Sequence, residues 1–292
     1  METAIGHLAA HELERPEGRA IGWGSVGPED GRPVLFVAGA ATGRSMAFGE
    51  RFLADAGVRI LTMDRPGMGA SGVDPERTIE STAADYAAVL AAAGAEGAPV
   101  VANSQGAPFG LQLALEGACE RLLLVSPADE VASPGIHRLL PPSLRDLVAA
   151  VDADPESASA FLASIGPEGM EDMVLANADE HDRVVYEHPK FREQYRVALE
   201  EGFANEGAGY VRDTLLAMGR WGIPLERIAT PVEIWQGDLD ASHSPDQAEH
   251  LSRRIPGAER RLVAFAGGAL LWTHAREVVA WAVDPASPEI ER

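Results

Sequence analysis

The stretch Val100-Val101-Ala102-Asn103-Ser104-Gln105-Gly106-Ala107 joins a short apolar run to a helical pattern. Such a run is typical of a strand buried on both faces of a parallel sheet. Ser104 falls at the junction, where a sharp turn would expose its hydroxyl and point neighbouring amides at a substrate oxygen. Small residues suit that turn, and Ala102 stands where the G-x-S-x-G pattern has its first glycine. We predict a nucleophilic serine here; the alternative is that Ser104 only caps the following helix.

Short apolar runs alternate with helical patterns on both sides of this stretch, which indicates a mostly parallel sheet with helices on both faces. We expect strands at 18–26, 33–38, 58–63, 99–103, 121–125, 232–236 and 259–264, and helices at 46–56, 78–93, 105–115, 244–254 and 272–283. From about Glu130 to Gly222 this alternation ends: the segment has helical patterns separated by prolines and few signs of strands. We interpret residues 1–129 and 223–292 as an α/β core, with residues 130–222 inserted as a helical cap.

Composition limits the partners and the compartment. Apolar residues make up 46% of the 292 residues, as in ordinary soluble proteins. The net charge of −21 would repel nucleic acid and anionic membranes, so we expect neither as a partner. The chain has no apolar run of about 18 residues that could span a membrane, and residues 1–15 lack a signal-peptide pattern. The single cysteine, Cys119, excludes an internal disulfide and fits the cytoplasm. We expect the tail at 284–292 to be loose.

Other candidate residues follow neighbouring strands, where open parallel sheets bind their ligands. Gly39-Ala40-Ala41-Thr42-Gly43 follows one of them, and its small residues would let amides approach a ligand. We predict that the amides of Ala40 and Gln105 form an oxyanion hole. The pair Asp64-Arg65 follows the next strand, and these two side chains could pair and fix their loop.

An acid candidate follows the strand at 232–236. Asp240 lies just past that strand, where a carboxylate could orient an imidazole and stabilise its cation. Asp238 in the same turn and Asp129 after the strand at 121–125 are alternative acids.

Together these segments resemble the α/β-hydrolase fold family. The matching segments, in the family's order, are the loop at 39–43, the stretch at 64–71, the turn around Ser104, the turn at 237–240 and Gly267-Gly268. The resemblance implies that nucleophile, acid and base follow one another in this order along the chain. By that order Ser104 is the nucleophile, Asp240 is the acid, and the base belongs at position 269. Ala269 stands there instead. We therefore expect Ser104 and Asp240 to converge on a space that an imidazole would fill.

Two explanations compete for Ala269. In the first, alanine replaces an original histidine, and the chain is an impaired serine hydrolase. In the second, the chain is a natural member of the family that binds a small ligand or promotes a cyclisation or elimination step. The remaining candidates for the base are His274, His243 and, in the cap, His137, although their positions are also typical of packing or surface histidines.

The resemblance also implies a substrate class. Its serine members act by acyl transfer on carboxylic esters, lactones or thioesters, and a serine nucleophile disfavours the branches that use aspartate, the epoxide hydrolases and dehalogenases. We expect the cap to shape an apolar pocket. Its predicted lining residues are Phe161, Met170, Met173 and Trp221. The sequence implies no metal and no cofactor, because it has no clustered histidine and cysteine spacing.

Overall fold

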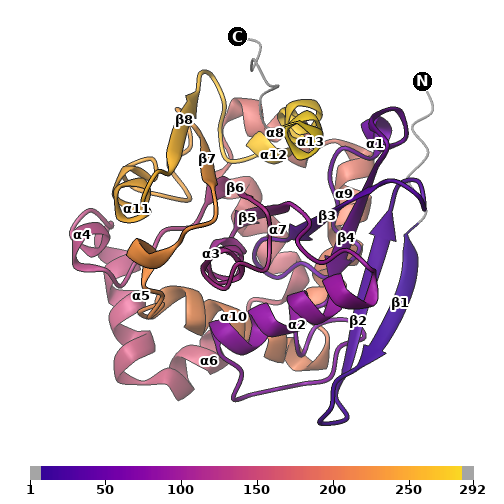
Figure 1. Ribbon diagram of the computed structural model, residues 1–292. Coiled ribbons are helices and arrows are strands. Elements are labelled where there is room, and N and C mark those ends of the chain that lie inside the picture. Colours follow the sequence, from indigo (N-terminus) through magenta and orange to yellow (C-terminus); the bar gives the residue numbers. More distant parts are fainter. Residues whose placement is uncertain (1–7, 285–292) are drawn as a thin grey trace.

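The computed structural model describes residues 8–284, in which eight strands form one sheet (Figure 1). The strands are β1 (Ala9–Glu14), β2 (Ala20–Val26), β3 (Arg32–Val37), β4 (Val58–Met63), β5 (Val100–Ser104), β6 (Leu122–Pro127), β7 (Val232–Gly237) and β8 (Glu259–Val263). Their order across the sheet is β1-β2-β4-β3-β5-β6-β7-β8. The β1–β2 and β2–β4 pairs are antiparallel, and the others are parallel. The predicted fold class, a mostly parallel α/β sheet, is confirmed.

Helices cover both faces of this sheet. One face carries α1 (Glu50–Ala56), α12 (Leu270–Thr273) and α13 (Ala275–Val283), and the other carries α2 (Ile79–Ala92), α3 (Ala107–Leu115) and α11 (Glu249–Arg254). Successive side chains of a strand point to opposite faces. Phe36 and Val101 therefore enter one apolar core, while Leu35 and Val100 enter the other.

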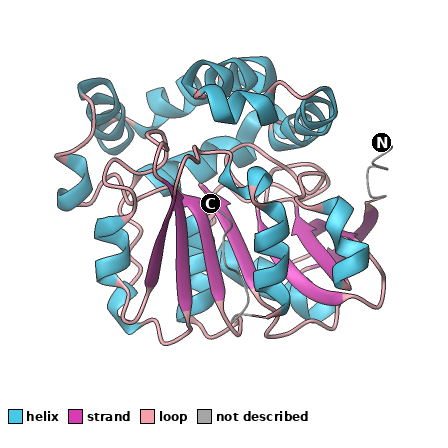
Figure 2. Ribbon diagram, turned by 90° about the horizontal axis from the view of Figure 1, so that it is seen from above, coloured by secondary structure: helices cyan, strands magenta, loops and turns pink. Residues whose placement is uncertain are grey.

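A helical insertion between β6 and β7 lies across one end of the strands (Figure 2). After the short α4 (Pro134–His137) come α5 (Pro142–Ala153), α6 (Pro155–Ala163), α7 (Gly166–Asn177), α8 (Glu180–Tyr186), α9 (Pro189–Gly202) and α10 (Ala208–Met218). We call α5–α10 the cap. Several of its prolines lie in the first turn of a helix, where a missing N–H costs nothing. The division at residues 130 and 222 stays a prediction.

Some predicted elements differ at their ends. β1 lies outside the predicted strands because its mostly exposed side chains give no apolar run. α1 and α11 begin later than expected because Gly49 and Ala248, which precede them, have the positive φ angles of the left-handed region. The helix expected at 272–283 divides at His274. Of the predicted loose tail, all but Asp284 lies outside the described residues. Among residues 8–284, no helix is both long and apolar enough to cross a membrane.

Candidate active site

Ser104 ends β5 and occupies a sharp turn before α3. Its φ of 50° lies in the left-handed region, which a non-glycine residue adopts only where the surrounding structure enforces it. Gly106 allows the turn, because a methyl group there would collide with the carbonyl oxygen of Val37. Ala102 replaces the usual glycine without strain because Gly110 of α3 faces it; a methyl group on Gly110 would lie 2.8 Å from the Cβ of Ala102. The local sequence thus gives the turn that a nucleophile needs.

The loop after β3 lies directly beside this serine. A methyl group on Gly39 would be 3.2 Å from the Cβ of Ser104. The guanidinium of Arg65 holds the loop by donating to the carbonyl oxygen of Gly39 at 2.7 Å. Within the described chain, the amides of Ala40 and Gln105 donate no hydrogen bond, so both can donate to a ligand oxygen. Their role as an oxyanion hole stays a prediction.

Arg65 and Asp64 bind separate partners rather than each other, which corrects the expected pair. Arg65 Nε donates to one oxygen of Asp213, on cap helix α10, at 2.5 Å. Arg77 Nη2 donates to the other oxygen of Asp213, also at 2.5 Å. All three side chains are buried. Asp64 instead accepts from the amide of Arg44. The loop beside Ser104 is therefore tied to the cap by a buried ion triad.

Asp240 is buried just after β7, and its main partner is a histidine from the same loop. The Nδ1 atom of His243 lies 2.9 Å from Oδ2 and 3.1 Å from Oδ1 of Asp240. The carboxylate also accepts from the amide and hydroxyl of Ser242 and from Gln236 Nε2. Burial acts to raise the pKa of Asp240, but the charge and hydrogen bond of His243 and the bonds from Ser242 hold that pKa well below its usual range.

The imidazole of His243 uses one ring nitrogen for Asp240 and leaves the other without a partner in the described chain. Its Nδ1 faces Asp240, which leaves Nε2 as the proton-accepting atom. Within the described chain Nε2 makes no hydrogen bond, to Ser104 or to any other residue, and the side chain is 17% exposed. Burial acts to lower the pKa of His243, but the charge and hydrogen bond of Asp240, together with the charge of Asp182, raise it above its usual value of 6.5.

The expected empty space beside Asp240 is filled by this imidazole. Ala269 is fully buried at the start of α12, and its amide donates to Asp182 of the cap. The ring of His243 lies against the neighbouring Gly268, where a methyl group would be 2.8 Å from Cε1. The histidine beside the acid therefore comes from the loop after β7, not from the loop after β8 that carries Ala269.

The other candidate acids and the second candidate base lack this arrangement. Asp238 is exposed. Asp129 accepts from the hydroxyl of Ser244 at 3.0 Å, and burial raises its pKa to about 6. His274 bonds the hydroxyl of Thr273 at 2.9 Å. Across residues 8–284, no group of three or more histidine, cysteine, aspartate or glutamate side chains is placed to hold a metal ion.

A cavity of about 90 Å³ brings Ser104, Ala40 and His243 together beneath the cap. Most of its other lining side chains are apolar or aromatic: Phe36, Met46, Met170, Val174, Tyr186, Phe191, Tyr195 and Trp272. Four of these rings pack in a row, in the order Tyr186, Trp272, Phe191 and Tyr195, with neighbouring centroids 5.2 to 6.2 Å apart. The cavity thus combines the polar side chains of Ser104 and His243 with a mostly apolar wall.

One of the four predicted pocket residues, Met170, lines this cavity. Val174 lies one turn later on α7 and shares its face, whereas Met173 points away and is 44% exposed. Phe161 is 57% exposed. Trp221 is buried instead in the core that α2 and α3 cover. None of these three side chains lines the cavity at Ser104.

The aromatic wall could have been found in part from the sequence. Phe191 and Tyr195 are four residues apart on α9, a spacing that puts two side chains on the same helix face. Trp272 and Tyr186 come from distant segments, and no spacing rule connects them with that pair.

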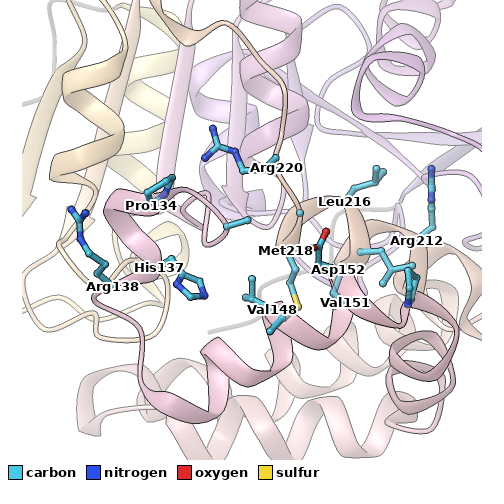
Figure 3. A pocket seen from close by; sticks show the side chains of 15 residues that line it. Pro134, His137, Arg138, Val148, Val151, Asp152, Arg212, Leu216, Met218 and Arg220 are labelled. Carbon is cyan, nitrogen blue, oxygen red and sulfur yellow. The ribbon is translucent and has the colours of Figure 1, made fainter.

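A larger hollow of about 670 Å³ lies elsewhere in the insertion, between α4, α5 and α10 (Figure 3). Val148 and Met218 contribute to its apolar surface, and Arg138 and Arg220 lie at its rim. Ser104, Asp240 and His243 do not line it. Size alone therefore does not locate the candidate chemistry in this protein.

The strand order, the turn at Ser104 and the acid–imidazole pair define a class of protein. A sequence profile of the alpha/beta hydrolase family matches residues 34–281, and the chain belongs to that family. The predicted resemblance is thereby confirmed. A search of curated protein sequences finds no significant match.

Solved structures share the fold at low sequence identity. A hydrolase from Pseudomonas aeruginosa PA01 is 20% identical, with a TM-score of 0.67 over 94% of this chain and 97% of the other. A thermophilic esterase from Thermogutta terrifontis is 21% identical, with a TM-score of 0.65 over 94% and 96%. An enol-lactonase from Burkholderia xenovorans LB400 is 19% identical, with a TM-score of 0.65 over 91% and 96%. At these identities the likeness concerns the fold.

Proposed function

We propose that this chain is a serine hydrolase that cleaves a carboxylic ester, a lactone or a thioester of a small, largely apolar substrate, with His243 as its base. One observation carries the proposal: the imidazole bonded to Asp240 faces the same cavity as the hydroxyl of Ser104. The structural neighbours described as an esterase and an enol-lactonase support this substrate class.

The mechanism is acyl transfer in two steps. Ser104 Oγ attacks the carbonyl carbon while His243 Nε2 takes its proton, and Asp240 stabilises the imidazolium. The amides of Ala40 and Gln105 donate to the oxyanion. The imidazolium then protonates the leaving group. Water, activated by the same imidazole, finally releases the acid and frees the serine.

The size of the cavity supports a short acyl group. A dry protein cavity of roughly 150 Å³ holds one benzene molecule, and the cavity at Ser104 measures about 90 Å³. Its wall of Tyr186, Phe191, Tyr195 and Trp272 offers apolar contact rather than charge. An activated acetate ester is therefore a suitable first probe.

The test is pre-steady-state hydrolysis of p-nitrophenyl acetate. We expect a burst of nitrophenolate equal to the enzyme concentration and an acetylated peptide that contains Ser104 in the mass spectrum. The Ser104→Ala variant should give neither. If no acetate ester, lactone or thioester gives a burst or a turnover, while small ligands still bind tightly, the alternative of a non-hydrolytic binding protein is correct.

The rate should increase with pH. The base must be neutral to accept a proton, and Asp240 raises the pKa of His243 above its usual 6.5 despite burial. The kcat/KM for p-nitrophenyl acetate should therefore be low below that pKa and reach a plateau above it, with an apparent pKa above 6.5. A flat profile between about pH 5 and pH 9 would contradict a histidine base.

A further inference from the structure

The cap contributes one buried carboxylate to the loop behind the imidazole. Asp182 lies on α8 and is 6% exposed. Its Oδ2 accepts from the amide of Gly268 at 2.8 Å, and its Oδ1 accepts from the amide of Ala269 at 2.8 Å. Each oxygen of this cap carboxylate thus accepts a hydrogen bond from one of two consecutive amides of the core.

The two glycines of this loop have different partners. A methyl group on Gly267 would lie 2.5 Å from Oδ1 of Asp182, so that only glycine admits the carboxylate. A methyl group on Gly268 would lie 2.8 Å from Cε1 and 3.1 Å from Nδ1 of His243, so that only glycine admits the ring. The loop is therefore held between a carboxylate of the cap and the imidazole.

The same helix also forms part of the cavity wall. Tyr186 is four residues after Asp182, on the same face of α8, and it lines the cavity at Ser104. A movement of α8 would therefore change the contact with Gly268 and the shape of the cavity together.

Two carboxylates of the described chain act on the charge of the imidazole. Asp240 bonds the ring from the loop after β7, and the charge of Asp182 acts on it from the cap. Each favours the imidazolium over the neutral ring, and together they outweigh the effect of burial on the pKa of His243.

We propose that Asp182 is the positioning residue of the catalytic base: by binding the amides of Gly268 and Ala269, it fixes the loop against which the ring of His243 lies. The cap, and not only the core, then sets the orientation of the imidazole. This inference rests on the proposed function, because it assumes that His243 is the base.

Asp182→Asn tests this role at nearly constant volume. The amide can accept only one of the two N–H groups and carries no charge, so the loop should loosen and the imidazolium should lose support. We expect kcat for p-nitrophenyl acetate, compared on the high-pH plateau, to fall roughly 10- to 100-fold, with KM changing much less. The rising limb of the pH profile should move to lower pH.

Glu171→Gln is the matched control. Glu171 is another buried cap carboxylate that binds two groups, but these are Arg192 and Arg196 of α9, and none of the three side chains lines the cavity at Ser104. This variant should keep the kcat and the pH profile of the unchanged protein. An equal loss of kcat in both variants would mean that any weakened cap slows the reaction, and the proposal would be wrong.

A measurement without turnover separates this inference from the proposed function. The Cε1 proton of His243 can be titrated by NMR in Ser104→Ala protein, alone and combined with either Asp182→Asn or Glu171→Gln. We expect Asp182→Asn to lower the pKa of His243 and Glu171→Gln to leave it unchanged. An unchanged titration with Asp182→Asn, or a kcat within about twofold of the original, overturns the role of Asp182. Absence of a burst in the unchanged protein would instead overturn the hydrolase.

Discussion

His243→Ala is expected to lower kcat/KM for p-nitrophenyl acetate by roughly 10⁴-fold or more, because removal of the base from a catalytic triad leaves mainly binding and oxyanion stabilisation. The imidazole is bonded to Asp240 and faces the cavity of Ser104. Free imidazole added to the variant should restore part of the rate, since the lost ring leaves a space of its own size. Such rescue would not occur if His243 only supported the fold.

Two further variants separate the candidate positions of the base. His274→Ala should keep kcat/KM within about twofold, because that ring bonds Thr273 and does not line the cavity. Ala269→His should give no gain while His243 is present. The opposite pattern would be an unchanged kcat/KM in His243→Ala and a large increase of kcat/KM in Ala269→His. It would show that the base belongs at position 269 and that this chain is impaired.

Asp213→Ala is expected to lower the free energy of unfolding by about 3–5 kcal/mol, because it leaves two buried guanidinium groups without their carboxylate. Arg65 and Arg77 are each at most 1% exposed in the side chain and bind opposite oxygens of Asp213. Urea denaturation followed by tryptophan fluorescence measures this loss. Arg65 also donates to the carbonyl oxygen of Gly39 beside Ser104. The variant should therefore lose activity at urea concentrations too low to unfold it.

Glu171→Gln provides the comparison for this prediction as well. Glu171 also bridges two arginines, but Arg192 and Arg196 are 38% and 57% exposed in their side chains. Water can solvate both guanidinium groups after the change, so the loss should stay below about 1 kcal/mol. Equal losses for the two variants would mean that burial of the arginines does not determine the cost.

The predicted residues differ in how well local sequence could place them. The turn at Ser104 could be predicted from its neighbours: a methyl group at position 106 would collide with the carbonyl oxygen of Val37, and the serine adopts a φ of 50°. The side chains that line the pocket were harder to predict. Met170 lines the cavity and Met173 does not, although both are apolar residues of α7. Which face of a cap helix is turned inward depends on packing against the core, which its own residues do not reveal.

Short-range patterns were enough to establish the α/β sheet, the helical insertion and the turn at Ser104, because hydrophobic periodicity and small residues act over a few neighbouring positions. The identity of the histidine that accompanies the acid depended on the folded chain. Family order pointed to position 269, but His243 reaches Asp240 from the same loop and lies against Gly268 of the loop after β8. A proton relay needs side chains to converge in space, and distance along the chain does not measure that convergence.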